Sequence, residues 1–574
     1  MGHPDRIVTE PMEPAKENGW PERTALLLLL GCIAVLQLWL VFRLNINWDE
    51  YWYLSQIHAY NRGDLATPFQ TVHVHLFSWL PAIPFADADQ VIIGRCVMIL
   101  CEIVTFAIIF DIARKLFSPA DALFALIVYL CAGFVLAHGM SFRTDPLAAM
   151  LMMAGLWLMT VARQSWPVAL VAGLAAAMAL LVTVKSVLFL PTFGAALLYR
   201  LNKRRLQPVL VFFVISAVAA IAIFALGWSL HSHSLASTPA PSASPTVSLN
   251  QDVLKQSAGQ SFDKTVASSG FFPGMRFFTR WLAFGPGAGL IILGSLFLAA
   301  VHAIRATGPS RFVPLLFALP FASILFYRNA YPYFYPFILA PVALSVAFFS
   351  QQFSNPSRRR LLVILLVAGF AFQAVYYLRN DQSAQRSTAR QVHAIFPEPV
   401  AYIDRNGMIP SFRKVGPFMS TRGMEGIMAK GEPVLARTIA QQRPPLVIAN
   451  SPYLEAALDR SFPVSRIPMP ADDVEALRDN YIHFWGPVWL AGMDLKTRGG
   501  ATRFTITIAG TYTLHCAGSA TLDGTARHCG ETVDLSAGQH SLDVPSGNQV
   551  KLLWGNRFQK PSAPPPTKPI YYGF

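Results

Sequence analysis

The sequence predicts a polytopic α-helical membrane protein with a soluble C-terminal region that is α/β first and β-sandwich-like at its end. Of the 574 residues, 53% are hydrophobic and only 14% are charged, a composition typical of chains that cross a bilayer repeatedly. About eleven apolar stretches are long enough to span hydrocarbon, and all of them lie before residue 380. After that point the composition becomes that of a soluble protein.

The first apolar stretch is interpreted as a retained span and not as a signal peptide, because no small-residue cleavage site ends it. We therefore expect a cytoplasmic tail over residues 1–23 and a membrane domain over residues 24–380. The predicted spans are 24–43, 91–113, 119–138, 145–162, 166–183, 186–201, 207–228, 283–303, 312–328, 331–350 and 361–379.

Basic residues gather in short loops on one side of this predicted bundle, and by the positive-inside rule that side is cytoplasmic. The exported side then holds the loops 44–90 and 229–282 and everything after residue 380. The formal net charge of +14 thus reflects topology and attraction to anionic membrane lipid, and we expect no nucleic-acid partner. The basic loop residues are Arg114, Lys115, Arg163, Arg200, Lys203, Arg204, Arg205, Arg305, Arg311, Arg358, Arg359 and Arg360.

The soluble region divides into two parts by its patterning. Over residues 381–495, helical segments at 434–442 and 452–458 flank a short buried-strand run, which predicts an α/β unit. Over residues 496–574, period-two alternation between glycine turns predicts a small antiparallel sandwich. Modules of this kind bind sugar in some proteins and only pack in others.

Two of the six cysteines, Cys516 and Cys529, lie in the exported tail, and an oxidising compartment favours a disulfide between them. The other four, which lie within predicted spans, are expected to be packing residues: Cys32, Cys96, Cys101 and Cys131.

Two adjacent carboxylates, Asp49 and Glu50, follow the first span directly. Carboxylates near hydrocarbon are costly unless water, a cation or a reacting group compensates them. A solvated loop pair is the plainer alternative. Three further polar groups are expected on the same exported face, and they turn the pair into a candidate site.

Each of those three groups also has a structural interpretation. His73 and His75 alternate, so on an extended segment they share one face, as metal ligands or phosphate donors need, yet interfacial histidines are common. Arg143 and Asp145 suit a site or a salt bridge in a tight turn. Lys185 suits a site or a side chain that reaches to the membrane surface.

This combination favours transfer from a phosphate-linked donor. A carboxylate can deprotonate an acceptor hydroxyl as general base, and Lys, Arg and His can neutralise a phosphate leaving group. A lipid tail on the donor explains why such a site is built on membrane spans.

The residues at this point resemble the GT-C superfamily of polytopic glycosyltransferases, in particular its family 39 branch, which contains bacterial lipid A aminoarabinose transferases and protein O-mannosyltransferases. The similarity covers roughly residues 20–350. The Lys-Pro-Pro-Leu-like segment of the family is replaced here by histidines. The matching text is Trp48-Asp49-Glu50-Tyr51-Trp52-Tyr53, Gly63-Asp64-Leu65, His73-Val74-His75-Leu76-Phe77-Ser78-Trp79-Leu80, Arg143-Thr144-Asp145-Pro146-Leu147, and Lys185 with Pro191.

The resemblance implies a GT-C fold in a bacterial inner membrane. It also implies inverting transfer of a sugar from a polyprenyl-phosphate donor to a periplasmic acceptor, which is lipid A or lipopolysaccharide, another lipid or glycan, or a protein. By position, Asp49 is the expected general base, and Glu50 and Asp145 orient the acceptor, the base or a cation. The residues expected at the donor phosphate are His73, His75, Arg143 and Lys185.

A cofactor is not specified by the sequence. Carboxylates with histidines also suit a divalent metal, for which Asp49, His73 and His75 are the candidate ligands. Two other functions compete with transfer. A lipid-linked sugar flippase or polysaccharide transporter predicts related halves and polar residues near the bilayer midplane. A membrane-anchored binding protein predicts that the soluble tail alone binds the ligand.

Overall fold

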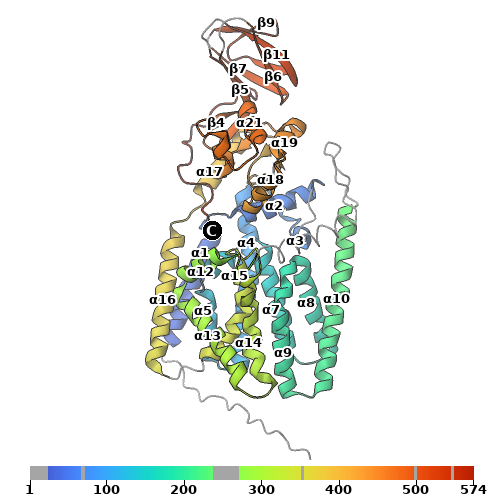
Figure 1. Cartoon of the computed structure of the whole chain (residues 1–574), viewed down its shortest axis with the longest axis vertical. Coiled ribbons are helices and arrows are strands. Elements are labelled where there is room, and N and C mark those ends of the chain that lie inside the picture. The colour runs from blue at the N-terminus through green and yellow to red at the C-terminus, as the bar shows by residue number, and fades with distance from the viewer. Residues whose placement is uncertain are drawn as a thin grey trace, which may run out of the picture.

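The computed structural model describes residues 23–65, 71–236, 270–350, 355–496, 501–516, 518–544 and 549–573. A bundle of upright helices forms one half of the molecule, and the C-terminal region stands on one end of that bundle (Figure 1). The expected N-terminal tail and most of the expected 229–282 loop lie outside the described residues.

Each of the eleven predicted spans coincides with helix, so the prediction of a polytopic helical membrane protein is confirmed. Within the described part of the chain, six helical segments are long and apolar enough to cross a bilayer: α1 (Arg23–Arg43), α4 (Asp87–Leu116), η2 with α9 (Val184–Phe189 and Leu190–Lys203), α10 (Leu206–Ala236), α13 (Pro286–Arg305) and α16 (Pro356–Leu378). Five further apolar segments are shorter: α5 (Pro119–Leu130), α7 (Thr144–Thr160), α8 (Trp166–Val182), η3–α14–η4 (Pro309–Phe312, Val313–Ala318 and Leu319–Leu325) and α15 (Phe334–Ser350).

Helix α15 forms the centre of the bundle and is buried along almost its whole length, packing against α5, α7, α13 and α14. Close packing replaces the hydrophobic effect as the force between helices in lipid, and small residues make it possible. Gly173 on α8 illustrates this, because a Cβ there would lie 2.6 Å from the Ser216 carbonyl oxygen of α10.

The bundle part of the chain also contains four short helices: α2 (Trp48–Asn61), α3 (Thr71–Leu76), α6 (Val135–His138) and α12 (Met275–Phe284). The apolar residues Tyr51, Leu54 and Ile57 of helix α2 are buried in one cluster with Tyr402 and Ile409 of the C-terminal region.

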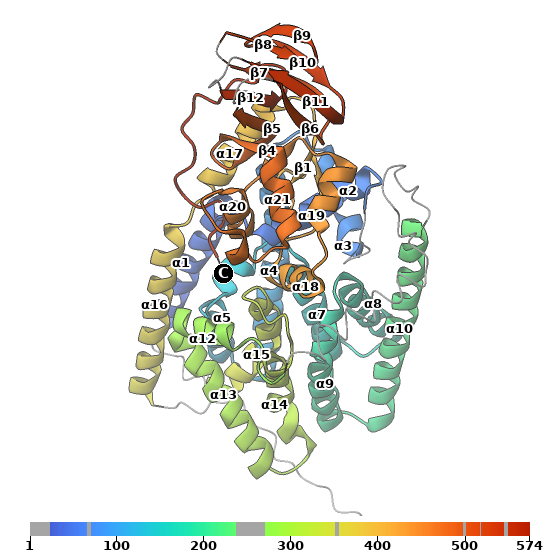
Figure 2. The ribbon, with the colours of Figure 1, turned by 45° about the horizontal axis from the view of Figure 1, so that its top comes forward.

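The C-terminal region begins with α17 (Ser383–Ile395) and contains both predicted patterns. The expected helices at 434–442 and 452–458 are α19 (Val434–Gln442) and α20 (Pro452–Leu458), and the strand run between them is β3 (Leu446–Ile448). Strand β1 (Ala401–Ile403) pairs in parallel with β2 (Arg413–Val415) and β3. Helices α18 (Thr421–Lys430) and α21 (Ala471–Asn480) cover this sheet together with α19 and α20 (Figure 2).

The two patterned parts share one sheet, whose order is β10-β7-β12-β5-β3-β1-β2, with β4 also paired to β5. Strand β5 (Val488–Lys496) pairs with β3 at its start and with β12 over its second half, so the expected boundary at residue 495/496 falls inside a continuous sheet. A second sheet, β6-β11-β8-β9, packs on the first over a common core. The remaining strands are β4 (Tyr481–Trp485), β6 (Thr502–Ile506), β7 (Gly510–His515), β8 (Ser519–Leu522), β9 (Thr525–His528), β10 (Thr532–Leu535), β11 (Gly538–Asp543) and β12 (Gln549–Trp554).

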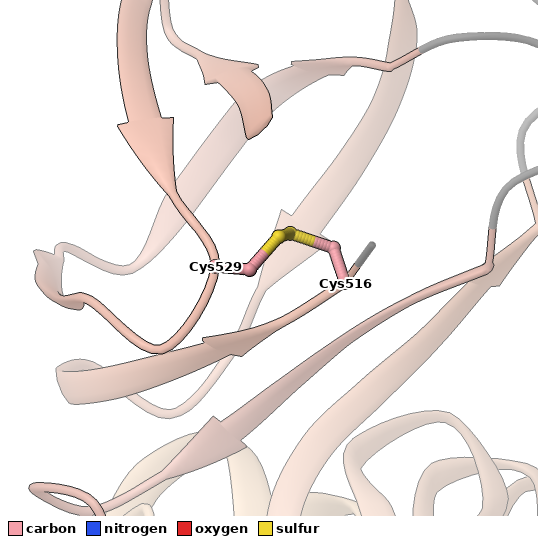
Figure 3. The surroundings of a disulfide bond; sticks show 2 residues. All are labelled: Cys516 and Cys529. Atoms are coloured by element: carbon pink, nitrogen blue, oxygen red, sulfur yellow. A yellow bond between two sulfur atoms is a disulfide. The ribbon is translucent and has the colours of Figure 1, made fainter. Parts of the chain in front are cut away.

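The structure contains the disulfide that the sequence predicted, between Cys516 and Cys529 (Figure 3). It links the end of β7 to the turn that follows β9. The chain then runs from β12 back toward the bundle, where the backbone oxygen of Ile570 accepts a hydrogen bond from Asn45 Nδ2 at 3.1 Å. The C-terminal residues therefore lie beside α2.

Candidate active site

The two adjacent carboxylates at the N-terminus of α2 point in different directions. Asn47 caps the helix, because its side chain accepts from the Asp49 backbone N–H at 2.9 Å while its own N–H donates to Glu50 at 2.9 Å. Successive helical side chains are about 100° apart around the axis. The Asp49 side chain keeps 14% of its exposure, whereas that of Glu50 keeps 1%.

Glu50 is part of the internal framework. It accepts two hydrogen bonds from Arg95, at 2.7 and 2.6 Å, and one from the Phe142 backbone N–H at 2.8 Å. Burial alone raises its pKa, but the charge and hydrogen bonds of Arg95 outweigh burial and the pKa is lowered. Arg95 also donates to the Leu44 carbonyl at 2.9 Å. Glu50 was expected to orient the acceptor, the base or a cation, and both of its side-chain oxygens accept hydrogen bonds from Arg95 and from backbone N–H groups.

Asp49 belongs to a chain of alternating charges that joins three elements. Arg143, the residue before α7, donates to the Asp49 carboxylate and also to Asp145, the latter at 3.4 Å. Lys185 of η2 donates to the other oxygen of Asp145. The structure thus brings together four of the predicted residues, and Asp145, only 1% exposed, holds both cations in place.

Aromatic rings fix the position of Arg143. Its guanidinium lies 3.4 Å from the ring centroid of Tyr333 and 5.6 Å from that of Tyr53. Lys185 lies 5.4 Å from the Tyr333 ring. Stacking on aromatic faces suits the planar guanidinium and leaves its edge available for hydrogen bonds.

His73 does not face the site, which corrects the expectation of a phosphate contact. Its ring is completely buried among Tyr53, Phe77 and Phe142, with centroids 5.1, 4.8 and 5.2 Å away. Both ring nitrogens lack a hydrogen-bond partner within the described chain. Burial, aided by the charge of Arg143, lowers the pKa of His73 to about 3, so the ring is neutral at physiological pH.

The His75 side chain has different neighbours from those of His73. The segment that carries both histidines is helix α3 and not an extended strand, so residues two positions apart leave the helix on different faces. The Nε2 atom of His75 lies 2.7 Å from Nδ1 of His231 near the end of α10, and the ring packs on Tyr60. Among the described residues no group of three or more His, Cys, Asp or Glu side chains is placed to hold a metal. Asp49, His73 and His75 therefore do not form the candidate metal site.

Asp49, Arg143 and Lys185 line a cavity of about 920 Å³ between the bundle and the C-terminal region. Asp49 is the only carboxylate among the described lining residues. The lining contains six cationic side chains: Arg143, Lys185, Arg276, Arg280, Arg405 and Arg422. A cavity of this size with one acid and many cations is built for an anionic ligand beside a single proton acceptor.

Four of these cations were not predicted from the sequence, and neither was Tyr333, on whose ring Arg143 stacks. Arg276 and Arg280 are four residues apart on α12, so they share a helix face, and this spacing was visible in the sequence. Tyr333 stands in an aromatic run at the start of the predicted span 331–350, a weaker signal. Arg405 and Arg422 come from the C-terminal region, and only the tertiary fold brings them to the cavity.

Residues 76–228 match the family model described as dolichyl-phosphate-mannose-protein mannosyltransferase. The match starts at the last residue of α3 and ends near the end of α10, so it includes Arg143, Asp145 and Lys185. It agrees with the resemblance to membrane glycosyltransferases of the GT-C superfamily. Curated proteins give no match to the chain.

Solved structures of three other proteins are similar to that of this chain. ArnT from Cupriavidus metallidurans, bound to undecaprenyl phosphate, is 13% identical with a TM-score of 0.48, covering 76% of this chain and 95% of that chain. The oligosaccharyltransferase AglB from Archaeoglobus fulgidus, in complex with an inhibitory peptide and a dolichol-phosphate, is 10% identical with a TM-score of 0.46, covering 91% and 76%. The arabinofuranosyltransferase AftD from Mycobacteria is 12% identical with a TM-score of 0.41, covering 92% and 61%. All three scores lie below 0.5, so the assignment depends on the family match and the residues.

Proposed function

We propose that the chain is a membrane glycosyltransferase of the GT-C superfamily and that it transfers a sugar from a polyprenyl-phosphate donor with Asp49 as general base. The observation that carries the proposal is the single carboxylate in a cationic cavity. The acceptor hydroxyl gives its proton to Asp49 while its oxygen attacks the anomeric carbon, and the bond from that carbon to the phosphate oxygen breaks. One displacement of this kind inverts the anomeric configuration.

Two features of Asp49 support the role of base. It is the partly exposed member of the carboxylate pair, so an acceptor can reach it, whereas Glu50 and Asp145 are buried in ion pairs. Its backbone is fixed by the Asn47 cap, and its side chain is aimed by Arg143. A base held at a defined position needs no reorganisation when the substrate arrives.

The cations on the bundle side of the cavity support the proposal of a lipid-phosphate donor. Arg143 and Lys185 are held by Asp145, and Arg276 and Arg280 of α12 have no carboxylate partner among the described residues. The leaving group is a lipid phosphate whose negative charge grows as the glycosidic bond breaks. Fixed cations stabilise that charge at the moment it develops, which is the main catalytic contribution expected here.

The compartment follows from the charge distribution. The basic loops on the opposite side favour a bacterial inner-membrane protein with its C-terminal region in the periplasm, and the disulfide suits that oxidising compartment. A periplasmic lipid, glycan, lipopolysaccharide or protein then supplies the acceptor hydroxyl.

The experiment is transfer by the purified full-length protein with a panel of polyprenyl-phosphate sugars and periplasmic-envelope acceptors. Wild type is compared with Asp49→Asn and with Asp472→Asn, an exposed carboxylate on α21 outside the cavity. We expect one donor to be consumed, the anomeric configuration of the product to be inverted, and only Asp49→Asn to lose transfer. Consumption of no donor, or normal transfer by Asp49→Asn, contradicts the proposal.

A further inference from the structure

Arg405 is a cation of the cavity that forms no ion pair within the described chain. Its guanidinium lies 4.0 Å from the ring centroid of Trp48, the residue directly before Asp49. Its Nε is buried and has no hydrogen-bond partner in the described chain, and no carboxylate there forms an ion pair with it. A buried donor without an acceptor is destabilising, so a side chain kept in this state points to an acceptor that a ligand supplies.

The turn that carries Arg405 is rigid. The buried Asp404 accepts hydrogen bonds from the backbone N–H groups of Asn406, Gly407 and Met408, at 3.1, 2.7 and 2.8 Å. The backbone N–H of Arg405 donates to Asn450 at 2.9 Å. The position of the Arg405 backbone therefore does not depend on a ligand.

The same turn is docked on the helix of the proposed base. Asn406 Nδ2 donates to the Trp48 carbonyl at 2.9 Å, and Tyr571 donates to Asn406 at 3.0 Å. Gly407 meets Ser55 of α2 so closely that a Cβ would lie 2.7 Å from the Ser55 side chain. Arg405 and Asp49 are thus held at a fixed separation by contacts between the C-terminal region and α2.

We propose that Arg405 forms an anion-binding subsite for the acceptor, which carries a phosphate or carboxylate close to the hydroxyl that is glycosylated. The inference rests on the proposed function, because it takes Asp49 to be the base that receives the hydroxyl proton. The guanidinium binds the anion through its free N–H groups while Trp48 supports its face.

The location of Arg405 separates this subsite from that of the donor. A donor with a polyprenyl tail stays anchored in the bilayer, so its phosphate meets the cations on the bundle elements, Lys185 of η2 and Arg276 and Arg280 of α12. Arg405 belongs to the C-terminal region, and its guanidinium lies over the ring of Trp48. Arg422 lies in the same wall, but Glu425 at 3.7 Å partly balances its charge.

The test measures binding of inorganic phosphate by isothermal titration to the full-length protein that has first been saturated with polyprenyl phosphate, at constant ionic strength. Saturation fills the donor site, so phosphate reports the second subsite. Wild type is compared with Arg405→Gln, Arg405→Lys and the control Arg437→Gln, an exposed arginine of the same region outside the cavity. Retained polyprenyl phosphate binding and an unchanged unfolding midpoint show that a variant is folded.

We expect one phosphate site in wild type, about 10- to 100-fold weaker binding in Arg405→Gln, smaller weakening in Arg405→Lys, and no change in Arg437→Gln. Absence of phosphate binding to the saturated wild type, or equal binding by Arg405→Gln, overturns the subsite. If polyprenyl phosphate itself does not bind, the donor proposal fails on its own. Phosphate binding that still depends on Arg405 then supports an anion subsite without that donor.

Discussion

Glu50 lies next to the proposed base. Its replacement by Gln is expected to lower the stability of the folded protein and to leave the transfer reaction measurable. Glu50 is 1% exposed and accepts hydrogen bonds from Arg95, from the Phe142 backbone N–H and from the Asn47 backbone N–H. An amide has one acceptor oxygen and brings its own N–H₂ group. Glu50→Gln therefore places a donor against the donors that surround it and leaves the Arg95 charge unpaired.

The expected cost follows from that geometry. Breaking a buried ion pair by removing one partner costs about 3–5 kcal/mol. Removing both charges together, in a Glu50→Gln and Arg95→Gln double variant, is expected to cost less than the sum of the single changes, since no unpaired charge remains. Glu50 also has a pKa below its ordinary value of 4.5 in the folded protein. Its stabilising effect is therefore complete above that pH and is lost as the pH falls through the lowered pKa.

The assay is the midpoint of thermal unfolding in detergent, recorded from neutral pH to well below the ordinary Glu pKa for wild type, Glu50→Gln, Arg95→Gln and the double variant. We expect a lower midpoint for Glu50→Gln at neutral pH and a smaller difference from wild type at acid pH. Transfer per folded molecule is expected to stay measurable. A Glu50→Gln variant with wild-type stability and no transfer would refute the structural role and return Glu50 to the reaction.

Three further predictions follow from single contacts. Gly407→Ala is expected to loosen the C-terminal region from α2 and lower the unfolding midpoint more than Gly431→Ala, because both glycines have positive φ but only Gly407 touches another element. Cys516→Ser is expected to lower the stability of the β-rich part by about 3 kcal/mol, the value for closing a short loop, and reductant should reproduce the change in wild type. His73→Phe is expected to keep donor binding, measured by titration of polyprenyl phosphate, because the buried neutral ring contacts only other rings; a large loss of affinity would restore its phosphate contact.

Periodicity and composition predicted the elements well. The apolar stretches became helices, and α19 and α20 match the predicted ranges, because local patterning determines which residues can be buried in a helix. Charge and spacing also identified four site residues, which the fold joins in one chain of ion pairs: Asp49, Arg143, Asp145 and Lys185. Residues next to the ends of spans share a leaflet, so topology alone placed them near each other.

The sequence did not predict the direction of some side chains or the long-range packing of the chain. Glu50 and Asp49 look equivalent in the sequence, and only the position of Arg95 on α4 decides which of them is buried. The two histidines were expected on an extended segment, where they would share one face. The segment is a helix, so their side chains leave it on different faces. Arg405 carries no local signal, since its place in the cavity depends on the docking of a turn more than 350 residues away from Asp49.

A single-turnover measurement tests whether Asp49 accepts the proton of the acceptor hydroxyl. Full-length protein preloaded with labelled donor is mixed with excess acceptor, and release of polyprenyl phosphate is followed for wild type and Asp49→Asn. We expect unchanged donor affinity and a rate about 10²- to 10⁴-fold slower in Asp49→Asn, the usual contribution of a general base. A rate within about twofold of wild type at equal donor occupancy would contradict it.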